Sequence, residues 1–277
     1  MRAVFALLYP GRIAFGLALL TALPLAAQSE MAEAWRLVGG HLYTEAGLKL
    51  KAADSPREQE LALAVILAAQ QPVTEEKLVA VERRLVVLAE GQDEVAAAAL
   101  YFAGRLRQVH FAQIDYAKAA EFYRTLAERQ PASAWAQLGL VKLALLTLYQ
   151  LPEPAAPAAR LAAAEALLPR VTIPRLRRDL LIVLGRTRLF YDQPLAAVLA
   201  DLLAADAIGG LTGVAEGGFL LQIGELSFRA EKWAQSRDYF TRYLQDNGAD
   251  PRSFAVRKKL AVIEARLAGA TAQEDAP

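Results

Sequence analysis

The chain has 277 residues with 31 basic and 30 acidic side chains, so its formal net charge is +1. That balance excludes bulk electrostatic attraction to nucleic acid. The sequence contains no cysteine, which excludes disulfide bonds, thiol catalysis and the acylated cysteine of a lipoprotein. Apolar residues make up 55% of the chain, and many are alanine and leucine, a composition that favours closely packed helices.

The first 27 residues have the order of features typical of an export signal. Arg2 and Arg12 precede an apolar run over residues 13–27, which is shorter than the ~20 residues that span a bilayer as a helix. Pro24 and the small residues after it suit a cleavage region. We expect residues 1–27 to be a signal peptide, with an uncleaved N-terminal anchor as the alternative. The rest of the chain would then be periplasmic or secreted.

Helix signals follow almost without interruption and predict an N-terminal helical array over residues 28–150. Residues 29–50 are expected to form one helix, with Trp35 and Leu42 as its apolar anchors. Capping residues or an N-terminal proline mark the later helix starts. These starts are at Pro56, Thr74, Asp93 and Asp115, and the helix that opens after Pro131 is expected to continue past Gly139 to about Tyr149.

A connector rich in proline and alanine, residues 151–157, separates this array from a C-terminal helical array over residues 158–268. Three prolines in seven residues motivate the hypothesis that the connector is a hinge. Helices are expected over residues 175–190, 194–205, 217–230 and 233–246, with a last one from about Asp250. Residues 269–277 are small and polar, and we expect them to form a disordered tail.

The stretch over residues 115–139 contains the most specific pattern. Ala119 and Tyr123 lie one helical turn apart, Pro131 ends that helix, and Trp135 opens the spacing W-x2-L-G that closes with Leu138-Gly139. Small and large residues at these offsets allow two antiparallel helices to interlock. Comparable small-residue steps end at Gly104, Gly185 and Gly224, so successive glycines are 35, 46 and 39 residues apart.

This pattern resembles the tetratricopeptide (TPR) repeat. The resemblance implies an all-α fold, a right-handed α-solenoid of antiparallel helix pairs whose concave groove binds a partner segment. Lys142 departs from the family, which usually has an aromatic residue there, and a generic α-solenoid is the alternative. Carried over position by position, the groove would be lined by Tyr101, Arg105, Leu140, Leu143, Ile182, Arg186, Leu221, Glu225 and Phe228. The apolar members could instead pack against neighbouring helices, as apolar stripes at helical spacing usually do.

A cluster of arginines before and within residues 175–190 forms a possible basic face. Arg175 and Arg178 share one side of the predicted helix. They could hold an acidic protein segment or anionic lipid headgroups. Alternatively, the arginines form a solvated face and pair with acids such as Asp201 or Glu216.

No arrangement of residues predicts a reaction or a cofactor. His41 and His110 are the two histidines, and neither has a second ligand at metal-binding spacing. The pairs Gly209-Gly210 and Gly217-Gly218 lack the lysine and serine or threonine of a phosphate loop, so we interpret them as helix ends. No nucleophile is paired with a base. We therefore expect a protein that is not an enzyme and has no cofactor or metal.

Together these features predict an exported, non-enzymatic scaffold for protein–protein interactions, in the cell envelope of a Gram-negative bacterium. The partner would be a protein or peptide and not a nucleic acid, with membrane contact only through an uncleaved N-terminal segment. The alternative is a helical accessory or inactive relative of a cell-wall lytic enzyme that binds peptidoglycan directly. Against it, such platforms usually present several exposed aromatics, and this chain offers few.

Overall fold

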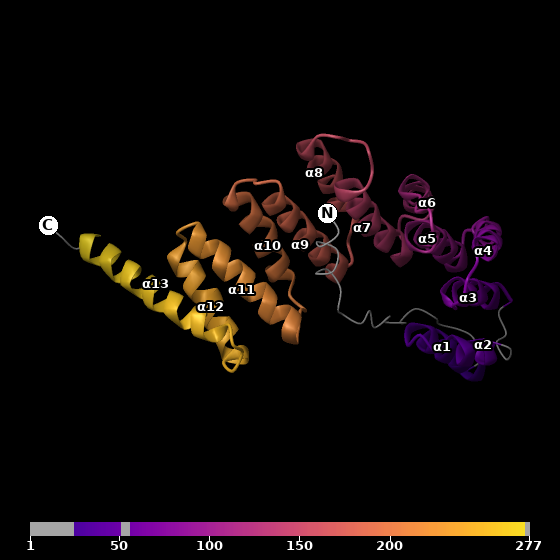
Figure 1. Ribbon diagram of the computed structural model, residues 1–277, viewed down its shortest axis with the longest axis horizontal. Coiled ribbons are helices and arrows are strands. Elements are labelled where there is room, and N and C mark those ends of the chain that lie inside the picture. Colours follow the sequence, from indigo (N-terminus) through magenta and orange to yellow (C-terminus); the bar gives the residue numbers. More distant parts are fainter. Residues whose placement is uncertain (1–24, 51–55, 275–277) are drawn as a thin grey trace. The chain divides into compact units, whose positions relative to one another are not determined.

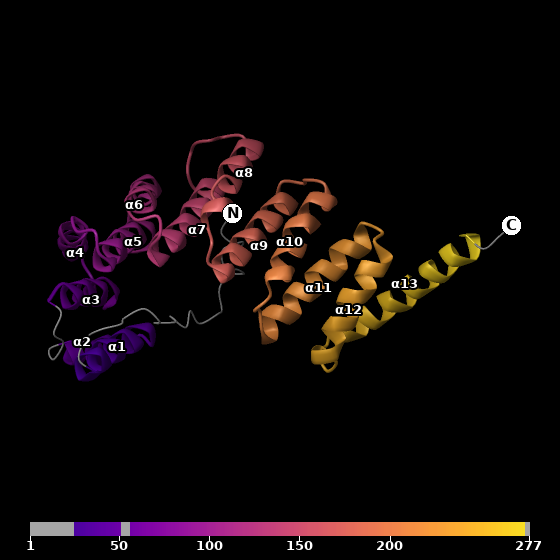
Figure 2. The same cartoon turned by 180° about the vertical axis from the view of Figure 1, so that it is seen from behind.

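The computed structural model describes residues 25–50 and 56–274, which form helices and contain no strand (Figures 1 and 2). The all-α prediction is confirmed. The described residues divide into two compact units, one up to Gly139 and one from Leu140 onward. Within each unit, consecutive helices pack in pairs. The predicted signal segment lies outside the described residues, except for its last three residues, which open the first helix.

Unit 1 is built from helices whose starts are fixed by short polar side chains. The carboxylate of Asp93 accepts a hydrogen bond from the Ala96 backbone at 2.9 Å, and Asp115 does the same for Lys118 at 2.8 Å, as expected for N-caps. The helices are α1 (Leu25–Gly39), α2 (Tyr43–Leu50), α3 (Pro56–Ala69), α4 (Glu75–Leu88), α5 (Glu94–Val109), α6 (Tyr116–Arg129) and the first residues of α7 (Ala134–Tyr149).

The single helix predicted over residues 29–50 is wrong. The chain breaks between α1 and α2, where His41 has a φ of +63° and the two glycines before it offer no resistance to a turn. Leu42, predicted as an apolar anchor, is 47% exposed in this turn. The helix therefore ends at this turn, although apolar residues continue at helical spacing beyond it.

Unit 2 comprises the remainder of α7 and the helices that follow it. They are α8 (Pro157–Glu165), the short 3₁₀ helix η2 (Leu168–Arg170), α9 (Pro174–Phe190), α10 (Leu195–Ile208), α11 (Gly213–Arg229), α12 (Trp233–Asn247) and α13 (Ser253–Glu274). Gly209 ends α10 with a φ of +71°, as predicted. Gly217 and Gly218 are not helix ends, because α11 begins four residues earlier and Gly217 is buried inside it. A Cβ at Gly217 would lie 2.8 Å from the Asn247 side chain, so close helix packing explains that glycine.

The last residues also differ from the prediction. The backbone of α13 is helical to Glu274, across most of the stretch 269–277 that was expected to be a disordered tail. Alanine is frequent in this stretch and has the highest helix propensity, which favours continuation of the helix. No described helix is both long and apolar enough to cross a membrane.

The helix pairs interlock where glycine on the first helix meets a large side chain on the second. A Cβ added to Gly104 of α5 would lie 2.5 Å from the ring of Tyr123 in α6, and one added to Gly224 of α11 would lie 2.6 Å from Phe240 in α12. Gly185 of α9 meets Leu202 of α10 in the same way, at 2.9 Å. The predicted interlock of small and large residues is thus present in three helix pairs.

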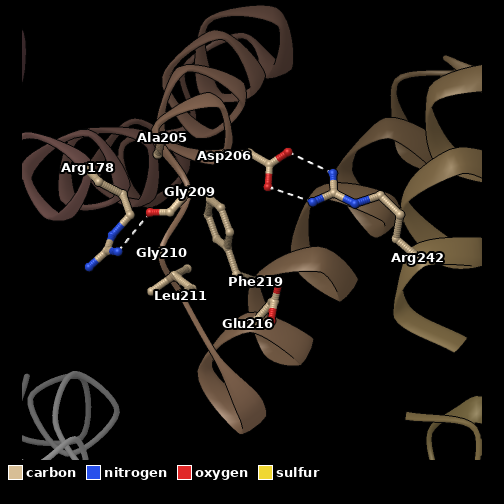
Figure 3. Close-up of a pocket in the computed structure, with 9 residues that line it drawn as sticks. All are labelled: Arg178, Ala205, Asp206, Gly209, Gly210, Leu211, Glu216, Phe219 and Arg242. Carbon is tan, nitrogen blue, oxygen red and sulfur yellow. Dashed lines mark hydrogen bonds and ion pairs between the residues drawn. The ribbon is translucent and has the colours of Figure 1, made fainter. Parts of the chain in front are cut away.

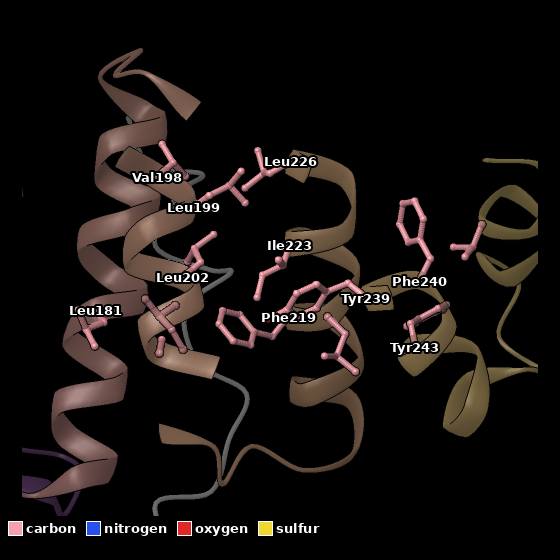
Figure 4. Packing of buried hydrophobic residues seen from close by; sticks show 14 of the residues in the cluster. Leu181, Val198, Leu199, Leu202, Phe219, Ile223, Leu226, Tyr239, Phe240 and Tyr243 are labelled. Carbon is pink, nitrogen blue, oxygen red and sulfur yellow. The ribbon is translucent and has the colours of Figure 1, made fainter. Parts of the chain in front are cut away.

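The core of unit 2 is continuous from α9 to α13 (Figure 4). Phe240 and Tyr243 of α12 are fully buried, and they lie between Ile223 of α11 and Val256 of α13 in one apolar cluster. Each helix of the series therefore buries a side against the next, the property that defines helical repeats.

Polar contacts reveal the same repeat period independently of the glycines. In unit 2, Arg186 and Gln222 are joined across 36 residues, and Asp206 and Arg242 also across 36. In unit 1, Ser133 donates to Glu94 across 39 residues. These separations join equivalent helices of successive pairs, and they lie close to the 34-residue TPR period.

The connector over residues 151–157 is held to the end of α7 by Arg160. Its guanidinium donates to the carbonyl of Thr147 at 3.0 Å and to that of Leu151 at 2.7 Å. A cation at a helix C-terminus satisfies unpaired carbonyls and complements the helix dipole. These contacts fasten the start of the connector to α7, so a hinge motion at that point would have to break them.

We expect Gly224→Ala to lower the free energy of unfolding by about 1–3 kcal/mol, because the new methyl overlaps the Phe240 ring. Gly218→Ala in the same helix is the matched control, since a Cβ there meets nothing within 4 Å. That variant should gain about 0.5–1 kcal/mol from helix propensity. Thermal melts followed by circular dichroism measure the stability of both variants. Equal shifts in melting temperature would show that close packing of Gly224 against Phe240 does not stabilise the fold.

We expect Arg160→Met to make the connector the first site of cleavage by proteinase K, because the carbonyls that it binds are released. Arg175→Met, at an exposed arginine of α9, is the control and should leave the digestion pattern unchanged. Mass spectrometry of the early fragments locates the cut. A connector in Arg160→Met that is as resistant as the helices would show that Arg160 does not hold it.

Candidate functional site

Four of the predicted groove residues are part of the buried core. Tyr101 is 7% exposed and Leu140 only 2%. Leu143 and Ile182 are 6% and 9% exposed. These residues are not available to a ligand at the surface, so for them the alternative of packing against neighbouring helices holds.

The remaining predicted residues of unit 2 lie half-buried on one face. Arg186 of α9 donates through Nε to Oε1 of Gln222 in α11 at 3.1 Å. One turn further along α11, Glu225 forms an ion pair with Lys259 of α13. Lys259 also lies 5.4 Å from the ring centre of Phe228. We call this surface the first-helix face, because its residues come from the first helices of successive pairs; they are Arg186, Leu221, Gln222, Glu225, Phe228 and Lys259.

Arg186 is the charged residue of this face whose side-chain partner is neutral. Its bonded partner, Gln222, is a neutral amide, and no carboxylate in the described chain lies within ion-pair distance of it. Burial lowers the pKa of the guanidinium, while the nearby Tyr149 opposes that effect. A half-buried cation that is not neutralised attracts an anionic group more strongly than a solvated one, because the local dielectric is low.

Two nearby arginines of unit 2, Arg188 and Arg242, are neutralised by carboxylates. Arg188, two residues after Arg186, contacts Asp201 at 2.8 Å and also pairs with Glu165. Arg242 forms two hydrogen bonds with Asp206, at 2.8 and 3.1 Å. Arg186 therefore differs from its neighbours in the chemistry of its partner as well as in its position.

Unit 1 contains a second arginine with an amide partner. Arg105 of α5, also predicted to line the groove, lies with Nη1 3.4 Å from Oε1 of Gln108. The same Gln108 oxygen accepts a hydrogen bond from the Tyr123 hydroxyl at 2.9 Å. Burial raises the pKa of Tyr123, so its hydroxyl stays protonated and does not neutralise Arg105.

The predicted basic face is reduced to Arg175, which is exposed. The side chain of Arg178 is only 11% exposed, and its guanidinium is bonded to Asp179 at 2.8 Å and to the Gly209 carbonyl at 2.9 Å. Arg177 is likewise turned to the carbonyl of Leu168, at 2.9 Å. Backbone carbonyls and a neighbouring carboxylate thus occupy the groups that were expected to bind an acidic ligand.

Arg178 lines a small cleft in unit 2 together with Asp206, Arg242, Glu216 and the turn after α10 (Figure 3). The cleft encloses about 60 Å³, well below the ~300 Å³ at which small-molecule pockets begin. Two of its arginines are already bonded, Arg178 to the Gly209 carbonyl and Arg242 to Asp206, as the dashed lines in Figure 3 show. We assign this cleft a structural role.

Hydrogen bonds to the Asp206 carboxylate join α10 to α12 beside the cleft. Asp206 accepts hydrogen bonds from Arg242 at 2.8 Å and from the Tyr239 hydroxyl at 2.7 Å. Burial opposes ionisation of Asp206, but these two donors outweigh it and lower its pKa. Burial, together with the carboxylate, raises the pKa of Tyr239 to about 12. Asp206 is therefore ionised, and Tyr239 protonated, at neutral pH.

Half-buried aromatic rings gather in unit 1. Trp35 of α1 stacks on Phe102 of α5 with ring centres 6.2 Å apart and planes 7° apart. Trp135 of α7 lies 5.4 Å from Phe102 and 5.3 Å from Tyr101. The sequence suggested few aromatics for a stacking platform, but the fold brings several together from separate helices.

The two histidines do not share a site. Nδ1 of His41 lies 2.7 Å from the Tyr43 hydroxyl. His110 is half-buried, and burial lowers its pKa, with the charge of Arg105 acting in the same direction. Among the described residues, no group of three His, Asp or Glu side chains is placed to hold a metal ion.

The sequence analysis missed Gln222 and Lys259, which complete the first-helix face. The signal that could have found them is the repeat period, because Gln222 lies 36 residues after Arg186 and Lys259 lies 34 residues after Glu225. Gln222 also lies three residues before the predicted Glu225 on α11, which is a helical spacing.

No protein-family model and no curated protein matches the chain. The site is therefore interpreted from its own chemistry: a row of apolar and polar side chains with a half-buried cation that is not neutralised.

We expect Asp206→Asn to lower the melting temperature at pH 7, by an amount corresponding to about 1–3 kcal/mol, because two charge-assisted contacts are weakened. The folded pKa of Asp206 is depressed, so its stabilisation is present above the unfolded pKa near 3.9 and is lost as pH falls through the folded pKa. The difference from wild type should therefore shrink below about pH 4. Melts from pH 3 to pH 7 measure it.

Asp238→Asn is the matched control for that variant, because Asp238 lies on α12, the helix that supplies both donors to Asp206, but its side chain is 66% exposed. Its melting temperature should follow wild type at every pH. A difference for Asp206→Asn that stays constant with pH would show that ionisation of Asp206 does not stabilise the fold.

Proposed function

We propose that this protein is an exported, non-enzymatic TPR-like scaffold that binds a partner protein in the cell envelope. The partner would present a partly apolar segment with one or two acidic side chains to the first-helix face. The array would be a right-handed superhelix of helix pairs, as the sequence resemblance implies. Such a preformed surface loses little conformational entropy on binding, so individually weak contacts can add up.

The observation that carries the proposal is Arg186. It is half-buried, it is bonded to a neutral amide, and Leu221 and Phe228 on the same face are half-exposed. A carboxylate of the partner would satisfy the remaining guanidinium donors bidentately, while apolar side chains of the partner would cover Leu221 and Phe228. Arg105 offers the same chemistry in unit 1.

Export rests on the sequence of residues 1–27, and a periplasmic or secreted location is part of the proposal. The absence of cysteine suits an oxidising compartment, because such a chain cannot form incorrect disulfides there.

A second candidate function is direct binding of peptidoglycan, as in a helical accessory or inactive relative of a cell-wall lytic enzyme. The observation that favours it is the group of half-buried rings formed by Trp35, Phe102 and Trp135. Sugar rings pack against aromatic faces, and flat side chains from several helices would offer such faces.

We expect a partner captured from an envelope fraction by the chain beginning at Gln28 to bind Arg186→Glu at least about tenfold more weakly than wild type. The reason is that the new carboxylate repels the acid that Arg186 attracts. Isothermal titration with the purified partner measures the affinity. The control is Arg237→Glu, at an arginine that already lies beside Asp238 on α12, and it should bind like wild type.

Equal affinities for wild type and Arg186→Glu would remove the first-helix face from the proposal. Co-sedimentation with purified peptidoglycan tests the second candidate. If wild type sediments and Phe102→Ala does not, the glycan function replaces the scaffold function.

A further inference from the structure

The last helix of unit 2, α13, is covered on one side. Val256 and Ile263 are 1% and 0% exposed and belong to the core that α12 shares. On the opposite side, Phe254 is 65% exposed and Val262 is 47% exposed. Figure 1 shows α13 beside α12, and no further helix among the described residues of unit 2 lies on its other side.

The sequence of α13 repeats the register of α11. Aligning Ile223-Gly224 of α11 with Leu260-Ala261 of α13 also aligns buried residues of the two helices. Phe219 then corresponds to Val256, and Leu226 to Ile263, all of them buried. α13 therefore has the pattern of the first helix of a pair.

In α11 the glycine of this register receives the second helix of the pair, since Gly224 packs under the ring of Phe240. The corresponding residue of α13, Ala261, is small and exposed. Phe254, Lys258, Ala261, Val262 and Ala265 lie at spacings that place them on one stripe. We call this stripe the outer face of α13, and it has the position where a second helix would pack.

The charges around the outer face are mostly positive. Lys258 lies within it, with Nζ 4.6 Å from the centre of the Phe254 ring. Arg257, which also donates to the Gly248 carbonyl at 3.0 Å, and Arg266 flank it, and Glu264 is the one acid between residues 253 and 268. The remaining cation, Lys259, is turned to Glu225 on the first-helix face.

We propose that the outer face of α13 docks an amphipathic helix of a partner protein. That helix places a large apolar side chain over Ala261, as α12 places Phe240 over Gly224, and carries acidic residues beside Lys258, Arg257 and Arg266. A second copy of this chain fits less well, because two outer faces would bring cations against cations. The site adjoins the first-helix face, because Lys258 and Val262 lie one and three residues from Lys259 on α13, and it adds a second partner surface to the array.

Two helical peptides based on α12 test the proposal against the full chain. Both keep Tyr239, Phe240 and Tyr243 of the sequence 233–247 and are hydrocarbon-stapled. One is made acidic by Arg237→Glu and Arg242→Glu; the other is made basic by Asp238→Lys and Asp246→Lys. Fluorescence anisotropy at low salt should give the acidic peptide an affinity at least about tenfold higher than the basic one.

Variants of the chain locate the binding. Ala261→Trp fills the position over which the large side chain packs and should weaken the acidic peptide about tenfold or more. Lys258→Glu should reduce the ratio of the affinity for the acidic peptide to the affinity for the basic peptide. Ala204→Trp changes an exposed alanine of α10 and should have no effect. Unchanged thermal melts show that the variants are folded.

Three results would overturn the proposal. The first is equal affinity for the two peptides, or no binding of either. The second is unchanged affinity in Ala261→Trp. The third is a dimer in sedimentation velocity that Ala261→Trp dissociates, which would mean that a second copy covers the face. Arg186→Glu should leave peptide binding unchanged, so this test is independent of the proposed function.

Discussion

The close approach of paired helices at glycine is the constraint on which the rest of the structure depends. At Gly104 and Gly224 a single methyl group would overlap the aromatic ring of the next helix. The missing side chain lets Tyr123 and Phe240 become fully buried, and these rings anchor the packing of their units. A close-packed interior has little room to relax, so the axial position of each helix is fixed by its partner.

That fixed position determines which side chains of successive pairs meet. Arg186 reaches Gln222, and Glu225 reaches Lys259, because α9, α11 and α13 follow one another in the same register. The result is a surface on which one cation has a neutral partner. The adjacent Arg188 is on the other side of the same helix and is neutralised by Asp201.

Much of the fold could be predicted from local signals. Asp93 and Asp115 cap helices where the sequence placed them, and the glycine steps mark real interlocks. The break at His41 was missed because apolar residues continue at helical spacing through it, although the preceding pair Gly39-Gly40 is a local turn signal. Less of the site followed from the sequence. Leu140 and Ile182 have the spacing of groove residues, yet packing buries them, and the partners of Arg178 come from backbone carbonyls that no sequence pattern displays.

The sequence by itself determined the helical class, the helix starts that a side chain caps, such as those at Asp93 and Asp115, and the small residues that allow pairs to interlock, because these are marked by local residue patterns. Tertiary structure decided which of the predicted residues reach the surface and which charges remain without a carboxylate. Those outcomes depend on helices that are 34 to 39 residues apart in the chain, as the contacts of Glu225 and Ser133 illustrate. Burial and charge neutralisation are properties of neighbours in space, and only the folded chain specifies those neighbours.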